Sequence, residues 1–488
     1  MGIIEHISPQ WAYRRQCWRQ AYEIQKRNYD AGMFDRQNRN WFASNESAQA
    51  TDKNYRAVVR ARSRDLERNS DLMNSNIFPW VRAVVGQGFK LEAKSDNENI
   101  NNQLEALFKK WCKKDNCDIT GTQSLWDMAR MAVRRKRVDG GILFVKCYTA
   151  GGVVPFKLQA VEVDELDENR LQPHTQGNKV VGGIEYNRYN YAVGYWIREY
   201  DIEGYQSEYS RYIERKNVIF YFSKNRPSQI REMPEMAATI GRIKEINGYV
   251  EAASIKERIA ACLSVFIKKA LPSGGIGRSM QGGTTKSYNE LQLTPGLITD
   301  LNAGDEIQVV NPGTAATSSS DYIKTMSRLI SAGQGISYEA ASRDLTQANY
   351  SSARQATIED EETFLPEQEK LKDEFLDEVY ETFVISAVLS GAIEIKDFWI
   401  NKDNYLAHEW NKKPKKWIDP IKEANANKIA ISTGQKTIAD IWREDGRDYK
   451  DVIDEMQKIQ EYAAEKGLYS ALPYLSIPTT EMKEGEKK

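Results

Sequence analysis

Few side chains of this protein have the types and spacing that catalysis or metal binding requires. Its three histidines are far apart and make no metal-binding pair: His6, His174 and His408. Cys112 and Cys117 lie five residues apart without a second pair, so they do not match a zinc site. Asp164 and Asp167 are a candidate pair for a divalent metal, although carboxylates in turns are usually solvated. We therefore expect no catalytic, metal or cofactor site.

The closest approach to a phosphate-binding loop is the Gly-rich segment 277–287. Such a loop needs Gly before its Lys, so that backbone amides can wrap the phosphates. Here Thr285 precedes Lys286, and no buried strand comes before the segment. The sequence also contains no RNA-binding aromatic motif, zinc finger or GxSxG elbow. We expect a flexible loop here and a protein that is not an enzyme.

The composition is that of a globular protein with a hydrophilic surface. The 488 residues include 68 Lys and Arg against 69 Asp and Glu, which excludes a globally basic nucleic-acid binder. Charge is unevenly distributed, because residues 1–140 hold 25 basic and 17 acidic side chains, whereas residues 351–380 hold 3 basic and 10 acidic ones. We therefore expect opposite potentials on different faces of the molecule.

The cysteines and the hydropathy pattern indicate where the protein works. Five cysteines form an odd, scattered set, which predicts a reducing compartment and no disulfide scaffold: Cys17, Cys112, Cys117, Cys147 and Cys262. The first residues lack the apolar core of a signal peptide, and no run of eighteen apolar residues occurs. We expect a soluble protein without membrane association.

The first part of the chain is typical of helices rich in Arg, Trp and Tyr. A helix from about Asn54 places Arg60, Arg64 and Arg68 at i, i+4 and i+8, on one face. We interpret this basic stripe as a solvated or neighbour-paired surface, with direct DNA contact as the alternative.

A mixed region of helix and sheet follows. Apolar residues on one face predict a helix over Ser124–Val138, which ends at the turn Asp139-Gly140-Gly141 before a buried strand. Alternating patterns then continue to Phe222 and predict strands joined by Gly- and Asn-rich turns. The sequence therefore predicts an α+β body with helices packed around sheets.

A change of period at Met233 predicts two helices with an insertion between them. The first helix, over 234–269, is weakened by Gly241 and Gly248 and ends near its two lysines. The second begins at Tyr322 and stops at Gly333. Between them, Gly, Ser, Thr and Pro predominate, and LQLTP and DEIQVV are strand candidates.

The rest of the chain is helical. A long acidic helix is predicted from Ser352 to Ser390, with a bend at Pro366. Three shorter helices follow, marked by cap residues: Asp419 with Pro420, Gly434, Thr437 with Asp440, Gly446, Asp448 with Asp451, and Gly467.

An ordered series of short motifs resembles the lambda-type portal proteins of tailed bacteriophages. The motifs span about 430 residues: Tyr29-Asp30-Ala31-Gly32, Arg39-Asn40-Trp41, Arg60 to Asn69, Val84-Val85-Gly86-Gln87-Gly88, Trp111, Asp139-Gly140-Gly141, Ile336 to Glu339, Asp344, Asn349 to Arg354, Gly434, Thr437 and Asp445-Gly446. The chain departs from the family pattern at Gly141, where members often have Glu, and the Gly-rich stretch 271–287 does not align.

The resemblance implies a portal fold with four parts, which are the wing, the stem, the clip and the crown. Along the chain, the expected segments are an N-terminal wing (1–233), a first stem helix (234–269), a clip (270–320), a second stem helix (321–336), a tunnel loop (337–351), the rest of the wing (352–415), and a crown with a tail (416–488). It implies a dodecameric ring at one capsid vertex, which is the channel for DNA packaging and ejection.

The resemblance also implies partners and a place. Expected partners are further copies of the chain, the terminase, a head–tail adaptor, the major capsid or scaffold protein, and non-specifically bound double-stranded DNA. The expected location is the virion, with the host cytoplasm during assembly. Two other functions stay open: a DNA-packaging ATPase or nuclease, and a different head-completion or capsid-shell protein.

Candidate contacts follow from this assignment. In the tunnel loop, Arg343, Gln347 and Asn349 can donate to phosphate oxygens without reading bases. Asp344 is expected to cap or pair locally, and residues 349–352 have the alternative role of a helix start capped by Ser351 or Ser352. The basic stripe and the acidic helix have opposite charge, so we expect them to meet between neighbouring subunits. The candidate residues of this contact are Arg60, Arg64, Arg68, Glu359 and Glu362.

Overall fold

The computed structural model describes residues 10, 13–18, 40, 42–261, 265–269, 305–309, 319–347, 349–412, 420–444, 447 and 449–465. The chain forms two compact units, one of residues 1–55 with 225–230 and one of residues 56–224 with 231–488. In the first unit, α3 (Ala48–Lys53) is capped by Ser47. The backbone N–H of Ala48 donates to Ser228 Oγ (2.9 Å), which connects the two segments of this unit.

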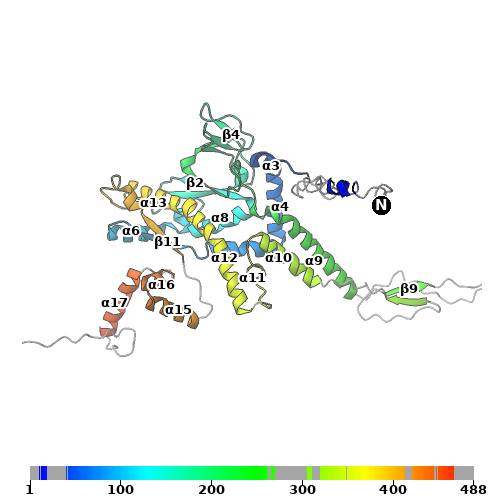
Figure 1. Cartoon of the computed structure of the whole chain (residues 1–488). Coiled ribbons are helices and arrows are strands. Elements are labelled where there is room, and N and C mark those ends of the chain that lie inside the picture. Colours follow the sequence, from blue (N-terminus) through cyan, green and yellow to red (C-terminus); the bar gives the residue numbers. More distant parts are fainter. Residues whose placement is uncertain are drawn as a thin grey trace, which may run out of the picture. The chain divides into compact units, whose positions relative to one another are not determined.

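Five helices open the second unit. They are α4 (Arg56–Asn69), α5 (Asp71–Val84), α6 (Glu98–Trp111), α7 (Lys114–Cys117) and α8 (Leu125–Asp139), and Figure 1 labels α4, α6 and α8 among them. The predicted start of α8 is confirmed, because Ser124 and Asp127 form a reciprocal capping box. Its predicted end is confirmed too, since Gly140 takes the left-handed conformation, with a φ of 95°.

The sheets are antiparallel, which agrees with the predicted α+β class. One sheet has the order β3-β2-β8, and another has the order β4-β5-β6-β7. Their strands are β2 (Gly141–Cys147), β3 (Lys157–Val161), β4 (Lys179–Val181), β5 (Ile184–Tyr186), β6 (Ala192–Ile197), β7 (Arg211–Glu214) and β8 (Val218–Phe222). The 3₁₀ turns η2 (Val163–Glu165) and η3 (Arg215–Asn217) accompany them.

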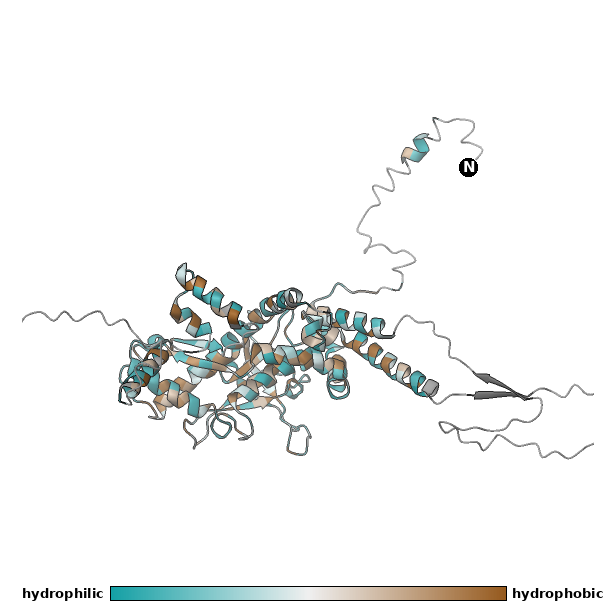
Figure 2. Cartoon of the chain, turned by 90° about the horizontal axis from the view of Figure 1, so that it is seen from below, coloured by the Kyte–Doolittle hydropathy of each residue, from teal (hydrophilic) through white to brown (hydrophobic). Residues whose placement is uncertain are grey.

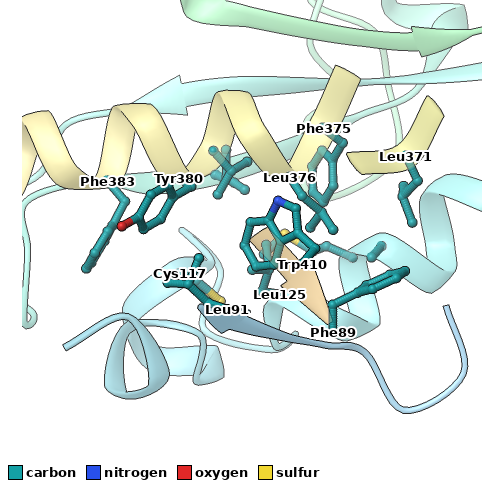
Figure 3. Close-up of a cluster of buried hydrophobic side chains, with 14 of the residues drawn as sticks. Phe89, Leu91, Cys117, Leu125, Leu371, Phe375, Leu376, Tyr380, Phe383 and Trp410 are labelled. Carbon is teal, nitrogen blue, oxygen red and sulfur yellow. The ribbon is translucent and has the colours of Figure 1, made fainter. Parts of the chain in front are cut away.

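Segments far apart in the sequence complete the body. Strand β1 (Phe89–Ala93) pairs with β11 (His408–Lys412), which follows the short helix α14 (Lys402–Leu406). The aromatic core lies between these strands, α6, α8 and the long helix α12–α13 (Figure 3). Trp111 stacks on Phe156 at 5.2 Å between centroids and donates its indole N–H to the Phe156 carbonyl (2.7 Å). This donation satisfies a buried polar group inside an apolar core.

The long acidic helix has its irregularity at a different place from the one predicted. Helix α12 (Tyr350–Leu371) continues through Pro366, and a π-helical turn, η5 (Lys372–Leu376), leads into α13 (Asp377–Leu389). Pro366 is exposed, so water can satisfy the carbonyl group that loses its N–H partner there. The π turn occurs where Phe375 and Leu376 enter the core, both fully buried.

The first of the two predicted helices ends earlier than expected. After the 3₁₀ turn η4 (Glu235–Ala238), α9 (Ile240–Ala261) stops well before the two lysines at 268 and 269. Residues Val265–Lys269 form β9, which pairs with β10 (Asp305–Val309). The segment contains Val, Phe and Ile, which favour strands, and its apolar spacing also fits a helix. The strand predicted at DEIQVV is confirmed, and the LQLTP candidate lies outside the described residues.

The two helices around this strand pair lie side by side. Helix α10 (Ser319–Gly333) contacts α9 through the rings of Tyr249 and Tyr322, whose centroids are 4.5 Å apart. Ile243 and Ile330 are fully buried at the end near the body. Figure 2 shows that hydrophobic residues along α9 and α10 are interrupted by hydrophilic ones.

Three helices end the described chain: α15 (Pro420–Ser432), α16 (Ile438–Glu444) and α17 (Tyr449–Glu465). The predicted start with Pro420, the left-handed Gly434 (φ 74°) and the reciprocal cap of Thr437 with Asp440 are confirmed. The cap residues predicted at 419, 446, 448 and 467 lie outside the described residues. No helix in the described part of the chain is long and apolar enough to cross a membrane.

Candidate functional site

The segment 337–351 is more ordered than a loop. It contains a short helix, α11 (Tyr338–Ser342), capped by Ser337, which accepts from the backbone N–H of Ala340 (3.2 Å). Ser337 in turn donates its N–H and its hydroxyl to the carboxylate of Asp360, both at 2.7 Å. Segment 337–351 is therefore not a simple loop, because α12 holds α11 in place.

Arg343 ends α11 in a left-handed backbone conformation, with a φ of 58°. This conformation costs a residue with a Cβ roughly 1–2 kcal/mol relative to the right-handed form. The side chain is exposed, and it forms no hydrogen bond or ion pair with any residue that the structure describes. Arg343 thus presents an unpaired cation at a fixed point of the backbone.

Gln347, a predicted contact residue, and Asp344 both have partners within the chain. Gln347 accepts from the Arg328 guanidinium (3.3 Å), which also lies 5.4 Å from the ring centroid of Tyr338. Asp344 accepts from the hydroxyl (2.6 Å) and the N–H (3.1 Å) of Thr346, which lowers the pKa of its carboxyl. The expectation that Asp344 pairs locally is confirmed.

Asn349 caps the long helix. Its side chain accepts from the N–H of Ser352 (2.8 Å), and Ser352 Oγ accepts from the N–H of Asn349 (3.0 Å), which is a capping box. The alternative of a helix start is confirmed for this segment. The cap residue is Asn349, however, and not Ser351 or Ser352 as predicted, because only the residue before the first helical one has the extended backbone that a cap needs.

Two arginines of the basic stripe on α4 are paired with neighbouring carboxylates, as one of the predicted alternatives had it, but they are not at the surface. Arg60 is 4% exposed, and it pairs with Asp164 (2.6 Å) and Glu232 (3.0 Å). Arg64 is half-buried and pairs with Asp139 (2.7 Å). Both arginines have turned inward because the chain folds carboxylates against α4, which no local pattern indicates. Of the three, only Arg68 is an exposed cation.

A buried ion network surrounds these arginines. Arg231 and Glu232 are 0% exposed, and Arg231 Nε lies 2.7 Å from Glu232 Oε2. Arg231 also donates to the Val163 carbonyl (3.1 Å), which connects the network to η2. Burial lowers the pKa of Arg231, but the Glu232 carboxylate more than offsets this, so the pKa is raised. The network therefore stays charged and holds α4 to the sheets.

A second buried cluster lies at the base of α9 and α10, and we call it the stem clamp: Trp80, Lys136, Arg137, Glu235, Gln334 and Glu367. Arg137 Nη1 lies 2.5 Å from Glu235, just before α9, and its Nη2 donates to the Gln334 carbonyl (3.2 Å), just after α10. The same guanidinium lies 3.6 Å from the ring centroid of Trp80. One side chain therefore holds the bases of both helices.

Lys136 extends the stem clamp to α12. It is 1% exposed and pairs with Glu235 (3.1 Å) and with Glu367, which also accepts from the Tyr221 hydroxyl. Burial raises the pKa of Glu235, but the neighbouring cations outweigh burial, so its pKa is lowered. Two adjacent cations next to a buried strand are the signal that could have revealed the clamp.

Three other Cys, His and Asp side chains that could do chemistry are buried, stacked on a ring or paired with a cation. Burial raises the pKa of the Cys117 thiol to about 12, and the His174 ring stacks on Tyr212 at 4.3 Å. Asp164 belongs to the buried network. No group of three or more His, Cys, Asp or Glu that could hold a metal ion occurs among the described residues.

Sequence comparison defines the class of protein to which this architecture belongs. Residues 34–368 match the family described as phage portal protein, lambda family, which is more than half of the chain. The chain belongs to this family of structural proteins, and the predicted resemblance is confirmed.

Individual relatives agree with the family. The chain is 24% identical over 449 residues to a probable portal protein of Halomonas phage phiHAP-1, covering 88% of this chain and 86% of the relative. It is 20% identical to portal protein B of Escherichia phage lambda, covering 86% of each chain. Among solved structures, a chain from the neck of a native GTA particle, computed with C12 symmetry, matches with a TM-score of 0.45 and 13% identity, covering 79% of this chain and 93% of that chain.

Proposed function

We propose that the chain assembles into a ring at one vertex of a phage capsid and forms the channel for DNA packaging and ejection. The observation that carries this proposal is the family match over residues 34–368. The helical hairpin α9–α10, which bears a strand pair and is held to the body by the stem clamp, supports it. The proposed place is the virion, with the host cytoplasm during assembly, and the proposed role is structural.

Electron microscopy of the purified full-length chain tests the ring. We expect rings with a central hole, of dodecameric symmetry. Shells or compact monomers would contradict the proposal and favour another head-completion or capsid protein. ATP turnover by the same preparation would instead favour the packaging-enzyme alternative.

The parts of a portal can be proposed along this chain. We assign the wing to 1–233 and 352–415, the stem to 234–269 and 321–336, the clip to 270–320, and the crown to the helices after 416. Strand β9 then belongs to the clip side of the first stem segment, since the helix ends at Ala261. In this assignment the clip docks the terminase and later the adaptor.

Deletion of residues 274–318, with a short linker that joins the two helices, tests the docking role. The stem clamp lies at the opposite end of both helices, so the wing is expected to stay folded while docking of terminase and adaptor is lost. Global unfolding of this variant would contradict a separate clip.

We propose Arg343 as the principal DNA contact of segment 337–351. Its cation is exposed and has no described partner, whereas Gln347 and Asn349 already bond within the chain and are proposed as weaker contacts. A channel through which DNA slides needs weak contacts that do not depend on the base sequence. Each added cation–phosphate contact raises the salt-dependent affinity for DNA and would slow the sliding duplex. Arg343 is the one cation that each subunit has in segment 337–351, which fits that requirement.

The variant Arg343→Ala tests this contact. Rings should form normally, while the amount of packaged DNA or its retention in the particle should fall. Arg343→Lys is the matched control, because it keeps the charge and should restore most of the loss. Normal packaging and retention by the Ala variant would show that this residue does not contact DNA.

A further inference from the structure

Two hairpin turns of the four-stranded sheet share one hydrogen-bond pattern. In the first turn (187–191), Asn187 Oδ1 accepts from the backbone N–H of Tyr189 (2.9 Å) and of Tyr191 (3.1 Å). The N–H of Asn187 donates to the Tyr191 carbonyl (3.0 Å), and Asn190 is left-handed with a φ of 59°. These bonds fix the turn, which displays Tyr189 with 71% and Tyr191 with 55% of their surfaces exposed.

The second turn (201–205) repeats this hydrogen-bond pattern. Asp201 Oδ1 accepts from the N–H of Glu203 (3.0 Å) and of Tyr205 (2.7 Å), and the N–H of Asp201 donates to the Tyr205 carbonyl (2.9 Å). Gly204 takes the left-handed position that Asn190 takes in the first turn. Tyr205 therefore corresponds to Tyr191, and it is 71% exposed.

The two turns differ in the charges around them. In the first, the Arg188 guanidinium lies 4.6 Å from the ring centroid of Tyr189, and that of Arg215 lies 4.4 Å from the ring centroid of Tyr191. Both arginines are exposed, and neither has an ion pair with a described residue. The second turn lies in an acidic stretch: Glu199, Asp201, Glu203 and Glu208.

A hollow of about 500 Å³ is lined by Glu214 and Asn217, which neighbour Arg215 in the sequence. Tyr148, His174 and Tyr212 also line it, and they give it aromatic walls. A hollow of this size accepts one or two side chains of a partner.

We propose that Arg188, Tyr189, Tyr191 and Arg215 form a docking surface, the tyrosine–arginine patch, for an acidic segment of another protein. Two unpaired guanidinium groups favour carboxylates, which they can bind with two parallel hydrogen bonds. Tyrosine and arginine are the side chains that carry most binding energy at protein interfaces. Because hydrogen bonds already fix the backbone that carries both tyrosines, the turn loses little conformational entropy when a partner binds.

The surrounding charge favours a protein partner over a nucleic acid. Residues 162–217, which include the second turn, hold 11 acidic and 7 basic side chains. A duplex would need a basic stripe along its backbone, and this lobe instead offers two cations in an acidic surrounding. A short acidic segment can place a few carboxylates on the two guanidinium groups, whereas the acidic surroundings repel the continuous negative charge of a duplex.

Charge reversal of the patch tests the proposal, which rests on the proposed function for its assembly readout. Full-length chains with Arg188→Glu and Arg215→Glu, or with Tyr191→Ser alone, are compared with Tyr205→Ser, the matched change in the second turn. We expect all variants to form rings, and the patch variants to enter assembled particles about tenfold less often than the control. Equal entry of all variants would overturn the docking surface.

The partner's chemistry is tested by photo-crosslinking from position 189 during assembly in infected cells. We expect an adduct with a peptide of a different protein that is rich in Asp and Glu, and its loss in the Arg188→Glu, Arg215→Glu chain. An adduct with DNA, with a second copy of this chain or with a non-acidic peptide would overturn the proposal, as would no adduct. Failure of the wild-type chain to form rings would count against the proposed function, while an acidic adduct would still support the patch.

Discussion

At the residue scale, Arg343 combines a costly backbone conformation with a free cation. Its left-handed φ of 58° suits glycine better than arginine, and nothing in the described structure satisfies its guanidinium. Strain held at an exposed residue is a common mark of a functional position. The same side chain is the one proposed to contact DNA, so its stability cost and its proposed role can be separated by substitution.

We predict that Arg343→Gly stabilises the folded chain slightly. Relief of the left-handed strain, roughly 1–2 kcal/mol, exceeds the entropy that glycine adds to the unfolded chain, so a net gain of about 0.5 kcal/mol is expected. Urea unfolding measures it, with Arg343→Ala as a near-neutral control. A loss of stability in the glycine variant would show that the arginine side chain makes stabilising contacts.

A second residue-scale prediction concerns the stem clamp and pH. Cations lower the pKa of Glu235 from its ordinary 4.5, so its stabilising contribution is complete above pH 4.5 and disappears as pH falls through the lower folded pKa. We expect Glu235→Gln to cost about 2 kcal/mol at pH 7 and progressively less below pH 4.5. Urea unfolding across this range measures the difference, with the exposed Glu208→Gln as control. A pH-independent difference would mean that packing, not charge, explains the loss.

At the element scale, the turn between α8 and β2 depends on close approach as well as on conformation. Gly140 has a φ of 95°, and a Cβ there would lie 2.5 Å from the Met233 carbonyl carbon. Gly151 has a similar φ of 102°, and a Cβ there would meet nothing within 4 Å. The two glycines therefore separate backbone strain from steric contact.

We predict that Gly140→Ala destabilises the chain far more than Gly151→Ala. The left-handed conformation costs each variant about 1 kcal/mol, and the contact with Met233 adds about 1–3 kcal/mol at Gly140 only. Urea midpoints of the two variants give the comparison. Equal losses would show that the chain around Met233 moves aside freely.

The elements that sequence predicts well are those with local signals. The start of the helix near Ser124, its end at the turn with Gly140 and the start at Pro420 depend on a few neighbouring residues, and all three occur as expected. Strand β9 was missed because its apolar spacing fits a helix, and its strand character depends on a partner strand about 40 residues away in sequence. Arg60 was misplaced for the same reason, because its partners Asp164 and Glu232 are distant in sequence.

At the scale of the whole molecule, ion pairs divide into buried and exposed sets. Arg60, Arg231 and Glu232 pair inside the chain, where salt screens little. Three residues of the predicted subunit contact are exposed and can still reach a neighbouring subunit: Arg68, Glu359 and Glu362. A ring held by such pairs and a fold held by buried ones should therefore respond differently to salt.

We predict that salt dissociates the ring before it unfolds the chain. At 1 M salt the screening length is about 3 Å, so contacts between exposed charges on neighbouring subunits should weaken, whereas the pairs around Arg231 should persist. Sedimentation should show smaller species in 1 M NaCl than in 0.1 M NaCl, with an unchanged far-UV circular dichroism spectrum. The charge-reversed Glu359→Lys, Glu362→Lys chain should form few rings even in 0.1 M NaCl. Rings that withstand both salt and charge reversal would mean that apolar contacts, for example through the exposed Ile358 and Leu365 of α12, hold the subunits together.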